Sequence, residues 1–311
     1  MHLPSLALSA SLLALSVVPA LAAPKVVASI VPVHALVAAV MEGVGTPVLL
    51  LSGQTSEHQA SYSLQQIEDL GRADAVFIVG QGLELKLGEL SGSETVEGKR
   101  FVALADVEGL RRLPIREGGR FTAHAHGEEE AGHDHEAGTA AFDPHLWLDP
   151  ANAKVMALAI AAELSKTDPG EAARYQANAV ALTGELDSLT AEIASALSGV
   201  KDKPFVVTHD AFQYFEHAFG LRAAGSISDF SGTPPSAQRL KEVRDTLKAT
   251  GAVCVFREPQ FSGKAASIVT EGTSAREGVL DPIGATLPPG KGAYATLLRT
   301  LARDLKACLE G

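Results

Sequence analysis

Four of the ten histidines of this chain lie close together in one acidic stretch, at His124, His126, His133 and His135. Neutral imidazole is the commonest protein ligand of transition metals, and imidazoles clustered with carboxylates chelate zinc, copper or nickel. The plainer interpretation is a solvated acidic loop, since runs of charge are usually solvated. The composition therefore indicates contact with metal without defining a particular site.

Three further histidines lie singly, each at a predicted strand end or in a rigid turn. His58 is in a polar loop just after the strand predicted at 47–51, and His209 joins a predicted strand to a predicted helix. His145 lies in a turn bounded by two Asp-Pro pairs, and Asp281 directly follows the last predicted strand. Side chains at the carboxyl ends of the strands of an open α/β sheet point into the crevice where ligands bind. Each of these residues alone could be a hydrogen-bonded loop residue, but three or four converging on one cleft would satisfy a tetrahedral zinc site.

The elements that must position these residues alternate along both halves of the chain. Short apolar runs separated by helical patterns predict an α/β fold, with parallel sheets covered by helices. In the first half we expect strands at 25–31, 47–51, 75–80 and 100–104, and helices near 34–41, 63–70 and 83–90. In the second half we expect strands at 204–208, 222–227, 252–256 and 278–280, and helices near 211–219, 236–250 and 263–271. His34 and His217 fall inside predicted helices and are expected to be structural.

One long helical pattern lies between the halves. Asp168 is a suitable N-cap residue, with Pro169 at the first helical position and Glu171 at the third. Farther along, apolar residues recur at steps of four and three, at Leu182, Leu186, Leu189, Ile193 and Leu197. The pattern predicts a helix over 168–198, about 45 Å long at 1.5 Å per residue. We expect this helix to be a rigid connection between two lobes, in preference to a coiled-coil oligomerisation segment. The N-terminal lobe would span 23–167 and include the His-rich loop at 117–140, and the C-terminal lobe would span 199–311.

The first residues predict export. The stretch from Leu3 to Leu21 is almost wholly apolar and runs into Ala20-Leu21-Ala22, a cleavage site of small residues, so we expect a signal peptide at 1–22. Its first residues contain no Lys or Arg, which departs from the usual pattern. Because no cysteine lies near the cleavage site, we expect a soluble protein without a lipid anchor.

The chain has two cysteines, Cys254 and Cys308. An even pair in an exported protein forms a disulfide by default, since thiols oxidise in that compartment. The net charge of −11 argues against nucleic-acid binding and suits a soluble protein that attracts cations.

Several motifs carry a resemblance to a known family. They are Thr55-Ser56-Glu57-His58 with Tyr62-Ser63-Leu64, Asp143-Pro144-His145-Leu146-Trp147-Leu148, and Thr208-His209-Asp210-Ala211-Phe212 with Tyr214-Phe215. Glu258-Pro259-Gln260-Phe261, the two cysteines and the His-rich loop add to the match. In these features the whole mature chain resembles the zinc-uptake branch (ZnuA type) of the cluster A-I solute-binding proteins, the bacterial solute-binding protein 9 family. These are periplasmic receptors for ABC-type metal importers.

The resemblance implies two lobes joined by a long helix, with metal at their interface held by His58, His145 and His209. The fourth position in this family is a carboxylate or water, and Glu57 and Asp281 both match carboxylate positions. Three imidazoles and one oxygen suit Zn²⁺ in four-fold geometry, whereas the related manganese receptors have a carboxylate as the third ligand. Zinc binding needs neutral imidazole, so affinity should fall below about pH 6.5. The implied partner is the membrane permease of an ABC zinc importer with its cytoplasmic ATPase, and we expect a monomer in the periplasm.

Other functions are compatible with the same residues. An exported zinc hydrolase would use Glu57 as general base on a zinc-bound water. It lacks any other catalytic signature, and a carboxylate that closes the coordination sphere would block the water, so we do not expect an enzyme. A manganese or other divalent-metal receptor, or a zinc-binding adhesin of the same fold, is the second alternative. For the loop at 124–135 we favour low-affinity capture of zinc over sensing of excess zinc or a solvated insertion.

Overall fold

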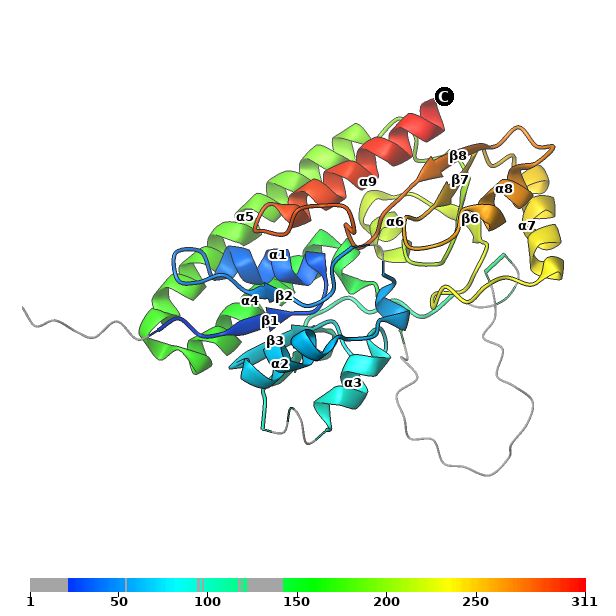
Figure 1. The fold of residues 1–311 in the computed structure, drawn as a ribbon. Helices are drawn as coiled ribbons and strands as arrows, with labels where there is room; N and C mark the ends of the chain where they lie inside the picture. Colours follow the sequence, from blue (N-terminus) through cyan, green and yellow to red (C-terminus); the bar gives the residue numbers. More distant parts are fainter. Residues whose placement is uncertain are drawn as a thin grey trace, which may run out of the picture.

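The computed structural model describes residues 22–311, apart from residues 54, 94, 95, 97, 117, 119 and 122–141. The signal peptide predicted at 1–22, except for its last residue, and the four histidines at 124–135 therefore lie outside the described residues. Two four-stranded parallel sheets form the centres of two α/β lobes (Figure 1). The predicted fold class is confirmed. None of the helices in the described ranges is long and apolar enough to cross a membrane.

The first sheet has the strand order β2-β1-β3-β4. Its strands are β1 (Val26–Ala28), β2 (Val48–Leu49), β3 (Ala75–Ile78) and β4 (Phe101–Ala103). Both faces of the central strands are covered, which explains why their sequences are continuous apolar runs. Val26, Ala28 and Phe77 face the large core next to α1 (Val31–Val40). Val27, Val76 and Ile78 pack with α2 (Leu64–Arg72) and α3 (Leu85–Ser91).

The second sheet has the matching order β6-β5-β7-β8. Its strands are β5 (Phe205–Val207), β6 (Ala223–Ser226), β7 (Cys254–Arg257) and β8 (Arg276–Val279), and its helices are α6 (Gln213–Phe219), α7 (Ala237–Thr250) and α8 (Lys264–Thr270). Val206 and Val255 pack beneath α7 and α8, whereas Phe205 and Phe256 belong to the large core on the other face. In both sheets the strand order reverses beside the first strand, and the loops that carry His58 and His209 follow strands of these sheets.

The long helix between the lobes is shorter than predicted. α5 (Ala172–Ala196) has 25 residues and begins after a 3-10 turn at Pro169–Glu171. The side chain of Asp168 does not cap this turn; its Oδ2 accepts a hydrogen bond from the Tyr175 hydroxyl at 3.0 Å. α5 thus lies within the predicted range 168–198, starting four residues later and ending two residues earlier.

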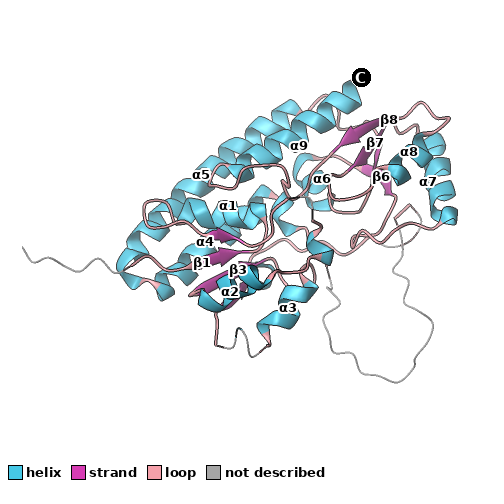
Figure 2. Cartoon of the chain, viewed as in Figure 1, coloured by secondary structure: helices cyan, strands magenta, loops and turns pink. Residues whose placement is uncertain are grey.

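Two long helices were not predicted from the sequence. α4 (Pro150–Thr167) begins at an Asp149 cap, whose Oδ1 accepts from the Ala151 amide at 2.8 Å, and it packs against α5. α9 (Ala293–Glu310) runs beside α5 along the upper edge of the molecule in Figure 2, where it contacts α1 of the first lobe and β8 of the second. The connection is thus a layer of helices rather than one isolated helix.

One continuous apolar core includes residues of both sheets, such as Phe77 and Phe205, together with α4, α5 and α9. The Cys254–Cys308 disulfide joins β7 to α9, so the predicted pairing is confirmed. The division of the chain into domains at 23–167, 168–198 and 199–311 stays a prediction. A shared core also favours small movements between the lobes over a wide hinge opening.

Candidate metal centre

Glu57 and His58 reach the centre from the first lobe. They lie in a 3-10 helix at Glu57–Gln59 that follows β2, and the Ser56 hydroxyl accepts from the His58 amide at 3.4 Å. The His58 side chain is 5% exposed and that of Glu57 is 2% exposed, so both are withdrawn from solvent.

His145 reaches the centre from the turn before α4. The Oδ1 atom of Asp143 accepts from both the backbone amide of His145, at 3.0 Å, and its Nδ1, at 2.7 Å. The next turn is fixed by Trp147, whose indole nitrogen donates to the Pro282 carbonyl at 2.8 Å in the second lobe. A fully buried imidazole is therefore locked with its Nε2 turned to the interior.

His209 reaches the centre from the second lobe, directly after β5. Oε1 of the fully buried Glu258 faces His209 Nδ1 at 2.8 Å and accepts from the His209 amide at 3.3 Å. The ring of Phe261 packs against His209 with 5.2 Å between ring centroids. As with His145, a carboxylate orients the ring and leaves Nε2 for a ligand.

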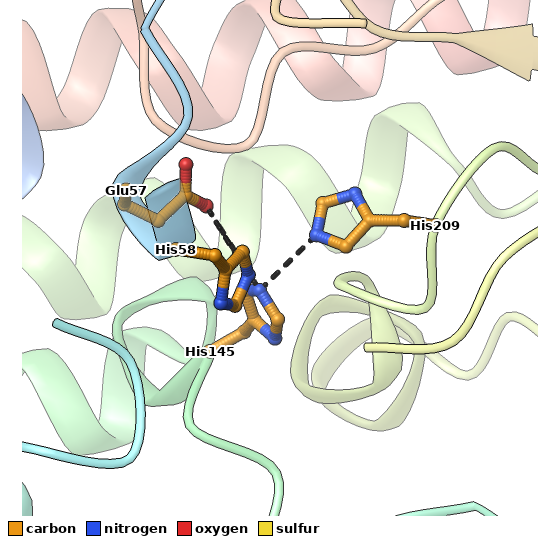
Figure 3. A group of neighbouring side chains, drawn as sticks. All are labelled: Glu57, His58, His145 and His209. Atoms are coloured by element: carbon orange, nitrogen blue, oxygen red, sulfur yellow. Dashed lines mark hydrogen bonds and ion pairs between the residues drawn. The ribbon is translucent and has the colours of Figure 1, made fainter. Parts of the chain in front are cut away.

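The four side chains meet between the lobes (Figure 3), with one possible ligand atom from each of Glu57, His58, His145 and His209 and no pair more than 4.8 Å apart. The Nε2 atoms of His145 and His209 are 3.3 Å apart. Glu57 Oε1 lies 3.9 Å from His58 Nε2 and 4.0 Å from His145 Nε2. In a tetrahedral zinc site with bonds near 2.0–2.1 Å, neighbouring ligand atoms are about 3.3 Å apart, so the group needs only a small contraction.

The hydrogen bonds of this group leave a place for a cation. An ionised carboxylate only accepts, so Nδ1 of His145 and Nδ1 of His209 donate to their acidic partners when those are ionised. For Asp143 this holds above pH 7, because burial raises its pKa to about 7. Two neutral rings would then present facing lone pairs at Nε2, and only a proton or a metal ion can lie between them. Within the described residues, Glu57 Oε1 and His58 Nε2 are buried without a hydrogen-bond partner. When all three rings are neutral with Nε2 unprotonated, four acceptors converge, and no donor from another of the described residues is directed at them.

The electrostatics of the group follow from its burial. Burial raises the pKa of Glu57 to about 7, although His209 opposes this rise. Burial, together with the neighbouring imidazoles, lowers the pKa of His58 and His145 well below the ordinary value. Burial would also lower the pKa of His209, but the carboxylates of Glu258, Glu57 and Asp210 together outweigh it, with Glu258 contributing most, and the pKa rises to about 9. Without metal, the proton between the two Nε2 atoms therefore belongs to His209.

Asp281 lies outside this group. Its Oδ1 accepts from the Gln260 amide nitrogen at 2.8 Å and from the backbone amides of Gly284, at 2.9 Å, and Ile283, at 3.3 Å. These contacts of Oδ1 close a turn, and the charge of Asp281 adds to the effect of burial in raising the pKa of Glu57. His34 is buried in α1 with Nε2 3.1 Å from the Pro47 carbonyl oxygen.

Sequence reasoning missed the roles of Asp143 and Glu258. Asp143 had a signal, because an acidic residue two positions before a histidine in a tight turn can reach both its amide and its ring. The sequence signal for Glu258 was weaker. Glu258 follows β7, but its pairing with His209 spans 49 residues and depends on the order of the strands.

Two α/β lobes on a shared helical layer, with a buried imidazole and carboxylate centre at their junction, define a two-lobed solute-binding protein. The sequence matches the family described as "ZnuA: Zinc-uptake complex component A periplasmic" over residues 26–308, and the chain belongs to this family.

Several named proteins resemble the chain. It is 44% identical over 309 residues to the "High-affinity zinc uptake system protein ZnuA" of Brucella suis biovar 1 (strain 1330), covering 92% of this chain and 91% of that one. It is 36% identical to the protein of the same name from Paracoccus denitrificans (strain Pd 1222), covering 98% of both. A solved structure titled "Crystal structure of ZnuA" superposes with a TM-score of 0.76 at 27% identity, over 92% of this chain and 99% of the other. The laminin-binding protein Lmb of Streptococcus agalactiae, described as bifunctional "with adhesin and metal transporting activity", has a TM-score of 0.75 at 26% identity, over 92% and 100%.

Proposed function

We propose that this protein binds one Zn²⁺ in the periplasm through Glu57, His58, His145 and His209 and delivers it to the membrane permease of an ABC importer driven by its cytoplasmic ATPase. The observation that carries the proposal is the 3.3 Å approach of two buried Nε2 atoms whose rings are each held by a carboxylate. That arrangement is the one in which a cation completes the hydrogen bonds and charges of the site. Membership of the zinc-uptake family supports zinc as the cargo.

The ligand set favours zinc over harder ions. Three imidazoles and one carboxylate match four-fold zinc geometry, whereas manganese prefers more oxygen ligands. Glu57, with a buried and unpartnered Oε1 among the described residues, is a better fourth ligand than Asp281, whose Oδ1 already accepts three hydrogen bonds.

The same geometry suits capture and release better than hydrolysis. With Glu57 in the fourth position, no site is left for an activated water, and all four side chains are withdrawn from bulk solvent. Three ligands come from the first lobe and one from the second. A small displacement of the lobes on the permease would therefore remove His209 and convert a four-coordinate site into a weaker three-coordinate one.

We further propose that the His-rich segment captures zinc at low affinity and passes it to this centre. Deleting residues 124–135 should leave one tight site and remove weaker ones. Loss of the tight site on this deletion would contradict the accessory role.

Titration of zinc into the purified protein tests the assignment. We expect one tight site per chain, and each single change His58→Ala, His145→Ala or His209→Ala should weaken it, as should Glu57→Ala. The control is Arg299→Ala, an exposed residue of α9 that pairs with Glu192 on the surface and lies outside the group. Unchanged affinity in all three histidine variants of the centre would refute the site.

A further inference from the structure

Residues 111–116, which we call the crossing segment, link the two sides of the metal centre outside its ligand atoms. On the first-lobe side, the carbonyl of Leu113 accepts from the backbone amide of Asp143 at 2.9 Å. On the second-lobe side, the amide of Leu113 donates to the hydroxyl of Tyr214 in α6 at 2.9 Å. One residue of the crossing segment thus contacts both the residue that orients His145 and the helix that follows His209.

Arg116 strengthens the second-lobe side of this link. Its guanidinium contacts both carboxylate oxygens of Asp210 and both of Glu216. Nε lies 3.0 Å from Asp210 Oδ2, and Nη1 lies 2.9 Å from Glu216 Oε2. Its side chain is 18% exposed, and those of the two acids are only 4% and 5% exposed. The planar fork of arginine matches two carboxylates at once in a way that lysine cannot.

These contacts lead directly to a proposed zinc ligand. Asp210 follows His209 in the chain, and its amide donates to the Asp229 carbonyl at 3.3 Å. Glu216 also accepts from the Ala223 amide at 2.8 Å, which ties the arginine to the start of β6. The position of His209 relative to the first lobe therefore depends on a buried ion cluster whose cation comes from the crossing segment.

We propose that Arg116 is a positioning residue for zinc, which holds Asp210 and Glu216 against the crossing segment and so fixes His209 opposite His145 without touching the ion. This inference rests on the proposed function. If Arg116 only stabilised the fold, its loss would lower the unfolding temperature but leave the coordination geometry and affinity of the folded protein unchanged.

The test compares Arg116→Gln and Arg116→Lys with the wild type. The matched control is Arg100→Gln, which makes the same charge change in an ion pair with Glu163 on the surface. Zinc affinity is measured by competition against a chelator, and Co²⁺ absorption reports the geometry of the metal site. We expect Arg116→Gln to weaken zinc binding about tenfold, at the lower end of the range for residues that orient metal ligands, and to alter the Co²⁺ spectrum. Arg116→Lys should lie between Arg116→Gln and the wild type, and Arg100→Gln should match the wild type.

A folded Arg116→Gln protein with wild-type zinc affinity and Co²⁺ spectrum would overturn the inference. If that variant does not fold, Arg116→Lys, which retains the buried charge, is judged by the same two measurements. Failure of the proposed function would give a different result: the wild type itself would lack a tight zinc site, or the His145→Ala variant would still have one.

Discussion

Replacing Glu258 by Gln should change how zinc affinity depends on pH more than it changes affinity at neutral pH. Glu258 is fully buried and faces His209 Nδ1 at 2.8 Å. It is the main reason that the pKa of His209 rises to about 9, because burial alone would lower it. The carboxylate also orients the imidazole and increases its basicity toward a metal. The change therefore has two opposite effects on zinc binding: it reduces the competition from the proton on His209, and it removes the carboxylate that orients this ligand.

The two effects have predictable sizes. At pH 7 the wild-type His209, with a pKa near 9, must lose its proton to bind zinc, and this competition weakens binding by about a hundredfold. In Glu258→Gln the pKa of His209 should fall to or below its ordinary value, so almost no competition remains at pH 7. Loss of the orienting carboxylate costs about 10–100-fold in metal affinity at every pH. At pH 7 the two effects nearly offset, so we expect the variant to bind zinc between equally well and about tenfold more tightly than the wild type, but about 10–100-fold more weakly at pH 9.5.

Competition titrations against a chelator from pH 6 to 9.5 provide the measurement. The tryptophan at position 147 is the only one in the sequence and its ring centroid lies 5.3 Å from that of His145, so its fluorescence can report occupancy. Glu192→Gln is the matched control, since Glu192 pairs with Arg299 on the surface. Wild-type affinity that does not rise from pH 7 to pH 9, or an identical pH dependence in Glu258→Gln, would refute the reasoning.

Three further changes test other parts of the structure. Replacing Cys254 and Cys308 together by Ser should lower the free energy of unfolding by about 4 kcal/mol in the chain-entropy account, with unchanged zinc affinity, as measured by urea unfolding and titration. Asp281→Ala should leave zinc affinity within about twofold of the wild type but destabilise its turn by about 1 kcal/mol for each net hydrogen bond lost; a large loss of affinity would restore it as a ligand. Gly225→Ala should cost about 1–3 kcal/mol in urea unfolding, because a Cβ there would lie 2.6 Å from the Arg120 carbonyl oxygen; an unchanged midpoint would contradict this close approach.

The four side chains that meet between the lobes had all been named from the sequence, whereas two of the long helices around them had not. His58 and His209 could be recognised because each follows a short apolar strand, and parallel strands bring their carboxyl ends to one edge. α4 was not predicted because its buried Met156, Ile160 and Leu164 lie among many alanines, so its apolar face differs little in hydrophobicity from its other faces. α9 has a clear leucine stripe on a polar background and could have been predicted by the same period used for α5.

The choice between Glu57 and Asp281 could not be made from sequence. Both are acidic residues in loops near strand ends, and they differ only in what surrounds their oxygens in three dimensions. Asp281 Oδ1 accepts hydrogen bonds from the side chain of Gln260 and from two backbone amides of its own loop, whereas Glu57 Oε1 faces the imidazoles. The structure also moves the expected pH window. The loss of affinity predicted below about pH 6.5 for ordinary histidines should begin near pH 9, because the pKa of His209 is raised.

X-ray absorption at the zinc edge tests the central claim most directly. The sample is the protein lacking residues 124–135, loaded with one equivalent of Zn²⁺, so that the His-rich segment contributes no ligands. The account predicts a four-coordinate ion with three imidazole nitrogens and one carboxylate oxygen at about 2.0–2.1 Å, and one imidazole fewer in His145→Ala. A six-coordinate, oxygen-rich shell, or an imidazole count that does not fall in His145→Ala, would contradict it.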